Sequence, residues 1–206
     1  MYFRYHVYLT ENRKGLAIYY QQKPYPHERS GDIKSKGMGL IHINYGQGVG
    51  KTTRAIGLAV RAAGEGLEVD FVQFLKSGDS AEVKIFEKIP NIHYRCPGKH
   101  PFIMSQGPQA VHYEHAENAL GFALDSVKRG AQVLVCDEIL DTLLFNLLQK
   151  EHLLDLMERC KDKVELVMTG RNAPQEIIDS ADYVTQLSQV KHPYYSGVKA
   201  RKGIEY

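Results

Sequence analysis

The sequence predicts an α/β fold: a mostly parallel open sheet with helices on both of its faces. From residue 39 to residue 187, short apolar runs alternate with helix-length segments, which is typical of sheets built from strand–helix–strand units. The run 133–136 is continuously apolar, as expected for a strand that is covered on both faces. A glycine-rich turn between the first of these strands and the next helix completes the pattern.

The first 38 residues are rich in tyrosine and break this alternation. The runs 6–10 and 16–20 flank a polar stretch and predict a hairpin. Two prolines and the stretch 30–39 that follow predict a connector. We therefore expect an N-terminal extension over residues 1–38 and an α/β domain over residues 39–206.

The remaining elements follow in chain order. Strands are expected at 39–44, 68–75, 91–96, 132–137, 164–169 and 183–187. Helices are expected after the glycine-rich turn and at 106–129, 151–159 and 174–181, and the longest of them carries an apolar stripe at helical spacing. Ligands of such sheets bind at the carboxyl ends of the strands.

Composition argues against several classes of function. The chain of 206 residues is 43% hydrophobic, an ordinary value for a globular domain. Its net charge of +2 gives no reason to expect a nucleic-acid partner. No apolar stretch is long enough for a membrane span, and the N-terminus does not read as a secretion signal. Three scattered cysteines fit a reducing cytoplasm.

A phosphate-binding loop is predicted where the first strand meets the first helix. Its residues are Tyr45-Gly46-Gln47-Gly48-Val49-Gly50-Lys51-Thr52-Thr53. Glycines let backbone N–H groups turn inward, where they and the positive helix end hold phosphate oxygens. Lys51 adds a charge and Thr52 a hydroxyl for magnesium. The simpler alternative, a glycine-rich turn with an exposed lysine, fits less well, although Tyr45 stands where a glycine is usual.

Polar residues at other strand ends are further candidates. Asp137 and Glu138 follow an apolar strand, where phosphate-loop proteins carry an acidic residue for magnesium; which of the two faces the ion stays open, and a capping role is the alternative. Arg171 follows another strand and suits either a phosphate or the surface. His112 and His115 lack further ligand residues and are read as surface or packing residues.

These pieces, taken with the C-terminal tail, resemble one known family. The matching segments are 46–53, Arg61-Ala62-Ala63-Gly64, 72–76, Asp137-Glu138, Thr169-Gly170-Arg171 and the tail 190–206. In this order they resemble the phosphate-loop type of corrinoid (cob(I)alamin) adenosyltransferase, over roughly residue 39 to the C-terminus. Many ATPases share the loop, whereas the Val-Lys-His-Pro and Gly-Val-Lys-Ala runs of the tail are specific. Members of that family also have the first glycine of the loop at the position of Gly46, one residue later than is usual.

The resemblance implies a reaction. ATP would donate its 5′-deoxyadenosyl group to the cobalt(I) of a corrinoid, and triphosphate would leave. Lys51 and Thr52 would be catalytic, and Arg61 and Arg171 would join the loop residues in binding ATP, although a solvated helix face is the plainer reading of Arg61. Mg²⁺ or Mn²⁺ would lie on Thr52 and one of the two acidic residues.

It also implies a corrinoid site, partners and a lid. Phe102 lines up with an aromatic residue that displaces the lower axial ligand of cobalt(II) and so eases its reduction by a flavoprotein. Met104 stands where the family often has tryptophan, Val49 where many members have lysine, and His192 would join the corrinoid site. A homodimer is implied. By its chemistry the tail 190–206 suits an ordered lid or a frayed end equally.

Two other functions stay open at this stage. One is a phosphate-loop ATPase or kinase that acts on the γ-phosphate. The other is a non-catalytic carrier of corrinoid or nucleotide, which the departures at Met104 and Val49 leave open. The residues do not distinguish complete cobalamin from a precursor such as the a,c-diamide as the natural corrinoid.

Overall fold

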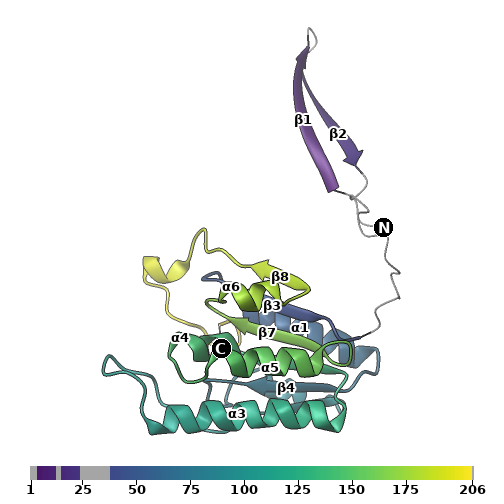
Figure 1. The fold of residues 1–206 in the computed structure, drawn as a ribbon. Coiled ribbons are helices and arrows are strands. Elements are labelled where there is room, and N and C mark those ends of the chain that lie inside the picture. Colours follow the sequence, from purple (N-terminus) through teal and green to yellow (C-terminus); the bar gives the residue numbers. More distant parts are fainter. Residues whose placement is uncertain (1–3, 13–14, 24–37, 206) are drawn as a thin grey trace. The chain divides into compact units, whose positions relative to one another are not determined.

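The computed structural model describes residues 4–12, 15–23 and 38–205, and the chain divides into two compact units, Met1–Lys36 and Gly37–Tyr206. In the first unit, β1 (Arg4–Asn12) pairs antiparallel with β2 (Gly15–Lys23) (Figure 1). These strands correspond to the predicted hairpin. The centre of its turn and the predicted connector up to residue 37 lie outside the described residues.

The second unit is an α/β domain whose six strands form one sheet. Its strands are β3 (Ile41–Tyr45), β4 (Val69–Gln73), β5 (Ile92–Arg95), β6 (Val133–Asp137), β7 (Glu165–Gly170) and β8 (Tyr183–Gln186). The order across the sheet is β5-β4-β6-β7-β3-β8, and every neighbouring pair is parallel. The predicted fold class, an open parallel α/β sheet, is confirmed.

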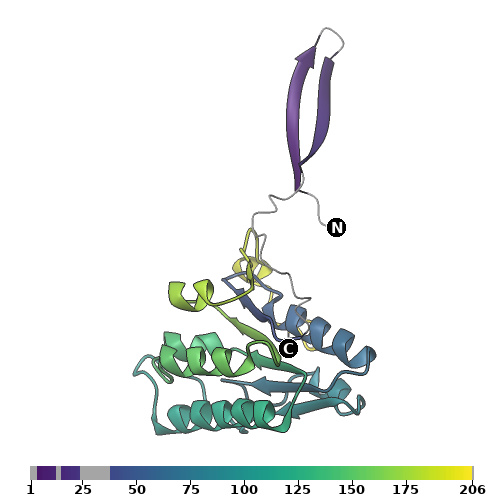
Figure 2. The same ribbon diagram turned by 45° about the vertical axis from the view of Figure 1, so that its right-hand side comes forward.

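Helices cover both faces of this sheet. They are α1 (Lys51–Gly64), α2 (Val83–Phe86), α3 (Ala110–Arg129), α4 (Ile139–Leu144), α5 (Lys150–Cys160) and α6 (Gln175–Asp179). The buried side chains of α1 and α2 share one apolar cluster, and those of α3 to α6 share the other. Figure 2 shows α1 on the opposite side of the sheet from α3 and α5.

The central strands supply side chains to both clusters, which explains their unbroken apolar sequence. In β6, Val133 and Val135 pack with α1, whereas Leu134 and Cys136 pack under α3, α4 and α5. Successive strand residues point to opposite faces, so a strand covered twice has no place for an exposed polar residue. Polar groups are therefore displaced to the strand ends.

The sequence missed two short helices, α2 and α4. With four and six residues, they are too short to display an apolar period. The tail, expected to lack regular structure, contains a single 3₁₀ turn, Pro193–Ser196. None of the described helices is long and apolar enough to cross a membrane.

Candidate active site

The glycine-rich loop that is predicted to bind phosphate lies in the expected place between β3 and α1, at the carboxyl end of the sheet. Its backbone is tied to two neighbouring strand ends: Gly46 N–H donates to the carbonyl of Gly170 (3.2 Å), and Gly48 N–H donates to that of Leu187 (2.8 Å). The loop therefore has a fixed shape between the ends of β7 and β8.

Two glycines of the loop are required by this fit. Gly46 has φ of 117°, a left-handed conformation that side chains disfavour. A Cβ atom there would lie 2.3 Å from the Leu187 carbonyl oxygen, and one on Gly48 would lie 2.8 Å from the Leu187 carbonyl carbon. Only hydrogen fits at either position.

A glycine pair tests this interpretation. We expect Gly46→Ala to lower the free energy of unfolding by about 1–3 kcal/mol, because its Cβ would meet backbone. Gly57→Ala, in the middle of α1 where a Cβ would meet nothing within 4 Å, should instead raise it by about 0.5–1 kcal/mol. Urea unfolding of both variants measures these changes, and equal effects would contradict the assignment.

The start of α1 is open to an anion. The helix has no side-chain cap hydrogen bond and no acidic residue in its first turn. The partial positive charge at its N-terminus is therefore not compensated by the protein. Lys51 Nζ donates to the carbonyl of Gly48 at 2.8 Å. Burial lowers the pKa of Lys51. A phosphate group beside the ammonium would favour its charged form.

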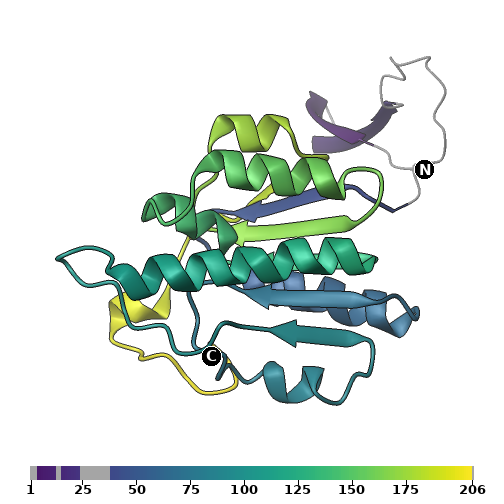
Figure 3. The same cartoon turned by 60° about the horizontal axis from the view of Figure 1, so that its bottom comes forward.

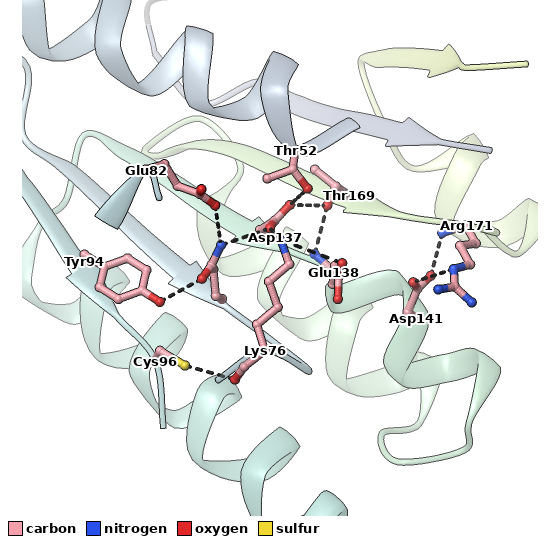
Figure 4. Close-up of polar contacts among 11 residues, drawn as sticks. Thr52, Lys76, Glu82, Tyr94, Cys96, Asp137, Glu138, Asp141, Thr169 and Arg171 are labelled. Atoms are coloured by element: carbon pink, nitrogen blue, oxygen red, sulfur yellow. Dashed lines mark hydrogen bonds and ion pairs between the residues drawn. The ribbon is translucent and has the colours of Figure 1, made fainter. Parts of the chain in front are cut away.

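Asp137, at the end of β6, is the centre of the polar site (Figure 4). Its carboxylate is fully buried and accepts hydrogen bonds from Thr52 Oγ1 (2.9 Å) and Thr169 Oγ1 (2.7 Å). Thr169 in turn accepts a hydrogen bond from Glu138 N–H (2.8 Å). The ends of α1, β6 and β7 thus meet at one carboxylate.

Lys76 lies three residues after the end of β4 and faces this carboxylate. Its Nζ is 3.0 Å from Asp137 Oδ2 and 3.8 Å from Glu138 Oε1. Burial alone would lower the pKa of Lys76, but the two carboxylates outweigh it and raise the pKa. The ammonium is therefore charged and balances part of the negative charge of Asp137 and Glu138.

Glu138 differs from Asp137 in exposure and geometry. Its side chain is 32% exposed, and its backbone is left-handed, with φ of 64°, an uncommon conformation for such a residue. Burial raises the pKa of Glu138 to about 7, although Lys76 opposes the shift. A cation bound beside Glu138 would therefore stabilise the charged form of its carboxylate.

A second group of polar side chains, drawn in Figure 4, supports the site. Gln73 donates to Glu82 (3.1 Å) and accepts from the Tyr94 hydroxyl (2.7 Å). On the other side, Asp141 accepts a hydrogen bond from Arg171 N–H, and the Arg171 guanidinium lies 3.6 Å from its carboxylate. Burial raises the pKa of Asp141.

A cavity of about 680 Å³ opens beside this polar centre. Thr52, Glu138, His100 and Phe102 all line it. The end of the tail, residues 203–205, contributes as well, so this part of the tail lies at the site. Phe102 is 90% exposed.

Three histidines form a cluster, in which His100 comes from the loop that carries Phe102 and His112 and His115 come from α3. The His100 ring stacks edge-on against the rings of His112 and His115, with centroids 5.0 and 4.7 Å away. His112 and His115 on α3 are buried, so the packing reading is confirmed and the surface reading is wrong. His100 Nε2 and His115 Nδ1 are buried and have no hydrogen-bond partner among the described atoms.

This cluster predicts acid sensitivity. Burial, and then the neighbouring histidines, lower the pKa of His100 from 6.5 to about 4. The unfolded chain would take up this proton at higher pH than the folded one, so stability is full above about 6.5 and falls between 6.5 and 4. Chemical unfolding from pH 7.5 to 4.5 should show a shallower decline for His100→Asn. Parallel profiles would contradict the prediction.

The structure gathers most of the predicted site residues but not all. It brings together Thr52, Asp137 and Glu138. Val49 is exposed at the tip of the loop. Arg61 is exposed in the last turn of α1, about 15 Å along the helix from Lys51. Of the predicted site residues, Thr52, Thr53, Glu138 and Phe102 line the cavity. Others, among them Lys51, Asp137, Arg171, Met104 and His192, do not.

The sequence analysis overlooked Lys76, Thr169 and Asp141 as site residues. Lys76 and Thr169 follow or end a strand, and Asp141 lies in the first turn after Glu138. The signal was available: a polar residue at the carboxyl end of a buried parallel strand faces the ligand edge of the sheet. What the sequence did not provide is which strand ends are neighbours.

The donor set favours a hard cation over a soft one. Within the described part of the chain, no group of three or more His, Cys, Asp or Glu side chains is arranged to hold a metal by itself. The oxygens of Thr52 and Glu138 suit magnesium, which takes few protein ligands and completes its shell with phosphate and water. A triphosphate with its cation is the ligand that this chemistry fits best.

Comparison with known proteins gives the family. The family model described as ATP:corrinoid adenosyltransferase BtuR/CobO/CobP matches residues 37–206. A corrinoid adenosyltransferase of Pseudomonas aeruginosa is 31% identical, over 82% of this chain and 84% of the relative. One from Sinorhizobium is 29% identical, over 92% and 91%. Corrinoid adenosyltransferase CobA of Salmonella typhimurium is 29% identical, over 82% and 86%.

Proposed function

The chain belongs to the ATP:corrinoid adenosyltransferase family, and from this premise we propose how its residues transfer the adenosyl group of ATP to a corrinoid. The observation that carries the proposal is the cavity that joins Thr52 and Glu138 to Phe102. Thr52 and Glu138 suit a triphosphate with its cation, and Phe102 offers an exposed aromatic ring to a flat corrinoid.

The transfer is an alkylation of cobalt. The electron pair of cobalt(I) forms a bond to the ribose 5′ carbon of ATP, the bond from that carbon to oxygen breaks, and its electrons leave with triphosphate. The protein needs no nucleophile or base for this step. Its task is to stabilise the charge on the leaving triphosphate, for which the start of α1 and Lys51 are suited.

A magnesium ion fits the residues at the start of α1. We propose that Glu138 and the Thr52 hydroxyl hold it, because Glu138 lines the cavity whereas Asp137 is fully buried and already accepts two hydroxyl hydrogen bonds. Asp137 then orients Thr52. When bound, the ion would neutralise charge on the triphosphate.

Replacement of Glu138 tests this division of roles. Glu138→Gln should raise the magnesium concentration needed for half-maximal activity by about tenfold or more, because one anionic ligand is lost. Calorimetric titration of ATP with and without magnesium checks the binding step. Glu117→Gln, exposed on α3, is the matched control. If Glu138→Gln leaves the magnesium requirement unchanged, Glu138 is not a ligand.

Phe102 is the candidate for contact with the corrinoid, and Met104 lies two residues further along the same loop. Both side chains are largely exposed and are therefore free to contact a ligand. We propose that this loop packs against the cobalt(II) corrinoid and excludes its lower axial ligand. The tail residues 203–205 line the same cavity, and His192 remains a proposed corrinoid contact.

Product analysis decides between this function and its rivals. With ATP, magnesium and a cobalt(I) corrinoid, we expect a light-sensitive cobalt–carbon bond and one triphosphate per corrinoid. Orthophosphate in place of triphosphate would favour a phosphate-loop ATPase or kinase. Binding of corrinoid and ATP without turnover would favour a carrier. Running cobalamin and its a,c-diamide precursor side by side identifies the preferred corrinoid.

Partners follow from the same chemistry. Cobalt(I) has to be generated by an electron donor, and we propose a flavoprotein reductase for this role in the cytoplasm, where ATP is available. We also propose a homodimer. Light scattering of the purified protein checks the second proposal, and reconstitution with a reduced flavoprotein checks the first.

A further inference from the structure

We propose that His112 and His115 are positioning residues that hold the loop carrying Phe102, and that His115 ties this loop to Lys76. The inference rests on the proposed role of Phe102 at the corrinoid. It concerns residues outside the phosphate loop and the acidic pair. Figure 3 shows the segment before α3, in teal, projecting beyond the start of that helix.

Phe102 depends on its neighbours for its position. The ring is 90% exposed, so packing of the side chain does not fix it. The backbone on its N-terminal side has several attachments, and on its C-terminal side Gly107 N–H donates to the Met104 carbonyl (2.9 Å) and closes a turn. The orientation of the ring is therefore set by how firmly residues 98–101 are held.

His112 supplies one attachment. Its Nδ1 accepts a hydrogen bond from Gln109 N–H (2.7 Å), so the ring hydrogen is on Nε2. That nitrogen lies 3.1 Å from the carbonyl of Pro101, which only accepts, so Nε2–H donates to it. The side chain thus caps α3 and holds the residue immediately before Phe102.

His115 supplies the second attachment. Its Nε2 lies 3.2 Å from the Gly98 carbonyl and 3.1 Å from that of Lys76. Both oxygens accept, so one N–H is shared between the loop and the segment that follows β4. Because Lys76 also pairs with Asp137, a single buried imidazole connects the loop of Phe102 with the acidic centre.

The backbone of His100 adds a third link. Its N–H donates to Ser77 Oγ (3.2 Å), and that hydroxyl lies 3.3 Å from the His100 carbonyl. Ser77 directly follows Lys76. The loop is therefore held to α3 and to the segment after β4 at Gly98, His100 and Pro101, all within four residues of Phe102.

Matched variants separate positioning from folding. The glutamine amide nitrogen reaches about as far as imidazole Nε2, and the asparagine oxygen about as far as Nδ1. His115→Gln therefore keeps the donor that His115→Leu removes. His112→Asn keeps the helix cap and loses the Pro101 contact, whereas His112→Gln does the reverse. Each pair compares a retained and a lost attachment at one position.

Hydrogen exchange of amides 98–107 in the full-length protein, without corrinoid or ATP, tests positioning directly. We expect His115→Leu and His112→Asn to speed this exchange about tenfold or more, and both glutamine variants to stay near the parent. The same two variants should lose adenosylation from cobalt(II) corrinoid while keeping most of it from pre-reduced cobalt(I). The KM for ATP should change little.

The outcomes distinguish the positioning role of the histidines from the corrinoid contact of Phe102. Unchanged loop exchange in His112→Asn and His115→Leu would overturn the positioning role. The positioning role would also be overturned if exchange in the loop became faster in these variants without loss of adenosylation from cobalt(II), provided that Phe102→Ala loses this adenosylation. If Phe102→Ala itself loses nothing, the proposed corrinoid contact fails, and the exchange data alone decide whether the histidines hold the loop.

Discussion

Lys51→Ala should reduce adenosyl transfer by a factor of about 10² to 10³ and leave the fold intact. Removal of one preorganised charge opposite a leaving anion has effects of this size. Lys51 has a single short contact among the described residues, to the Gly48 carbonyl in its own loop. Its loss should therefore cost about 1 kcal/mol of stability or less.

Turnover, ATP affinity and thermal unfolding of the same preparation measure the three quantities. We expect kcat to fall further than ATP binding weakens, because charge on the triphosphate grows as the bond to the ribose carbon breaks. Lys128→Ala, exposed on α3, provides the control for removing a lysine. Unchanged turnover in Lys51→Ala would remove the loop lysine from the mechanism, and a collapsed fold would show that its role is structural.

The sequence predicted those parts of the site that are formed by residues adjacent in the chain. The phosphate loop and Asp137-Glu138 depend on short runs with a strand before them, and the structure places both at the carboxyl end of the sheet. Strand and helix positions were predictable for the same reason, since each is a local apolar period. Among the elements that were predicted, only the ends shift by a few residues, whereas α2 and α4 are too short to show such a period.

A local sequence pattern could not predict the contacts between segments that are distant in the chain. Asp137 contacts Lys76 because β4 and β6 are neighbours, and Thr169 because β6 and β7 are neighbours. Nothing in a run of apolar residues states which strand lies beside which. The strand order therefore determines the polar centre, and it became known only with the structure.

The histidines of α3 are a different case, because a signal was present. His112 and His115 fall on the same stripe as Ala116, Ala119 and Ala123, which are all buried, at spacings of three, four and seven residues. A polar residue on a buried stripe needs hydrogen-bond partners. The stripe alone thus indicated two buried histidines with structural contacts, although it did not identify the loop that they hold.

Phe102→Ala should reduce adenosylation strongly, by about 10-fold or more, when the corrinoid is supplied as cobalt(II), and only slightly when it is supplied as cobalt(I). An aromatic ring that displaces the lower ligand acts on the reduction of cobalt, whereas the alkyl transfer that follows depends on Lys51 and the loop. The ring is largely exposed, so its removal leaves no cavity in the core and should not change stability by more than about 0.5 kcal/mol.

Parallel assays with a weak reductant and with a strong one separate the two starting states, and the absorption spectrum of the bound cobalt(II) corrinoid reports loss of its axial ligand. Ile85→Ala, an exposed apolar residue of α2, controls for removal of surface area. Equal losses from cobalt(II) and cobalt(I) would mean that Phe102 serves corrinoid binding in general. Phe102→Trp provides a second test. If residues 98–101 hold the position of the ring, another aromatic ring at this position should preserve adenosylation from cobalt(II).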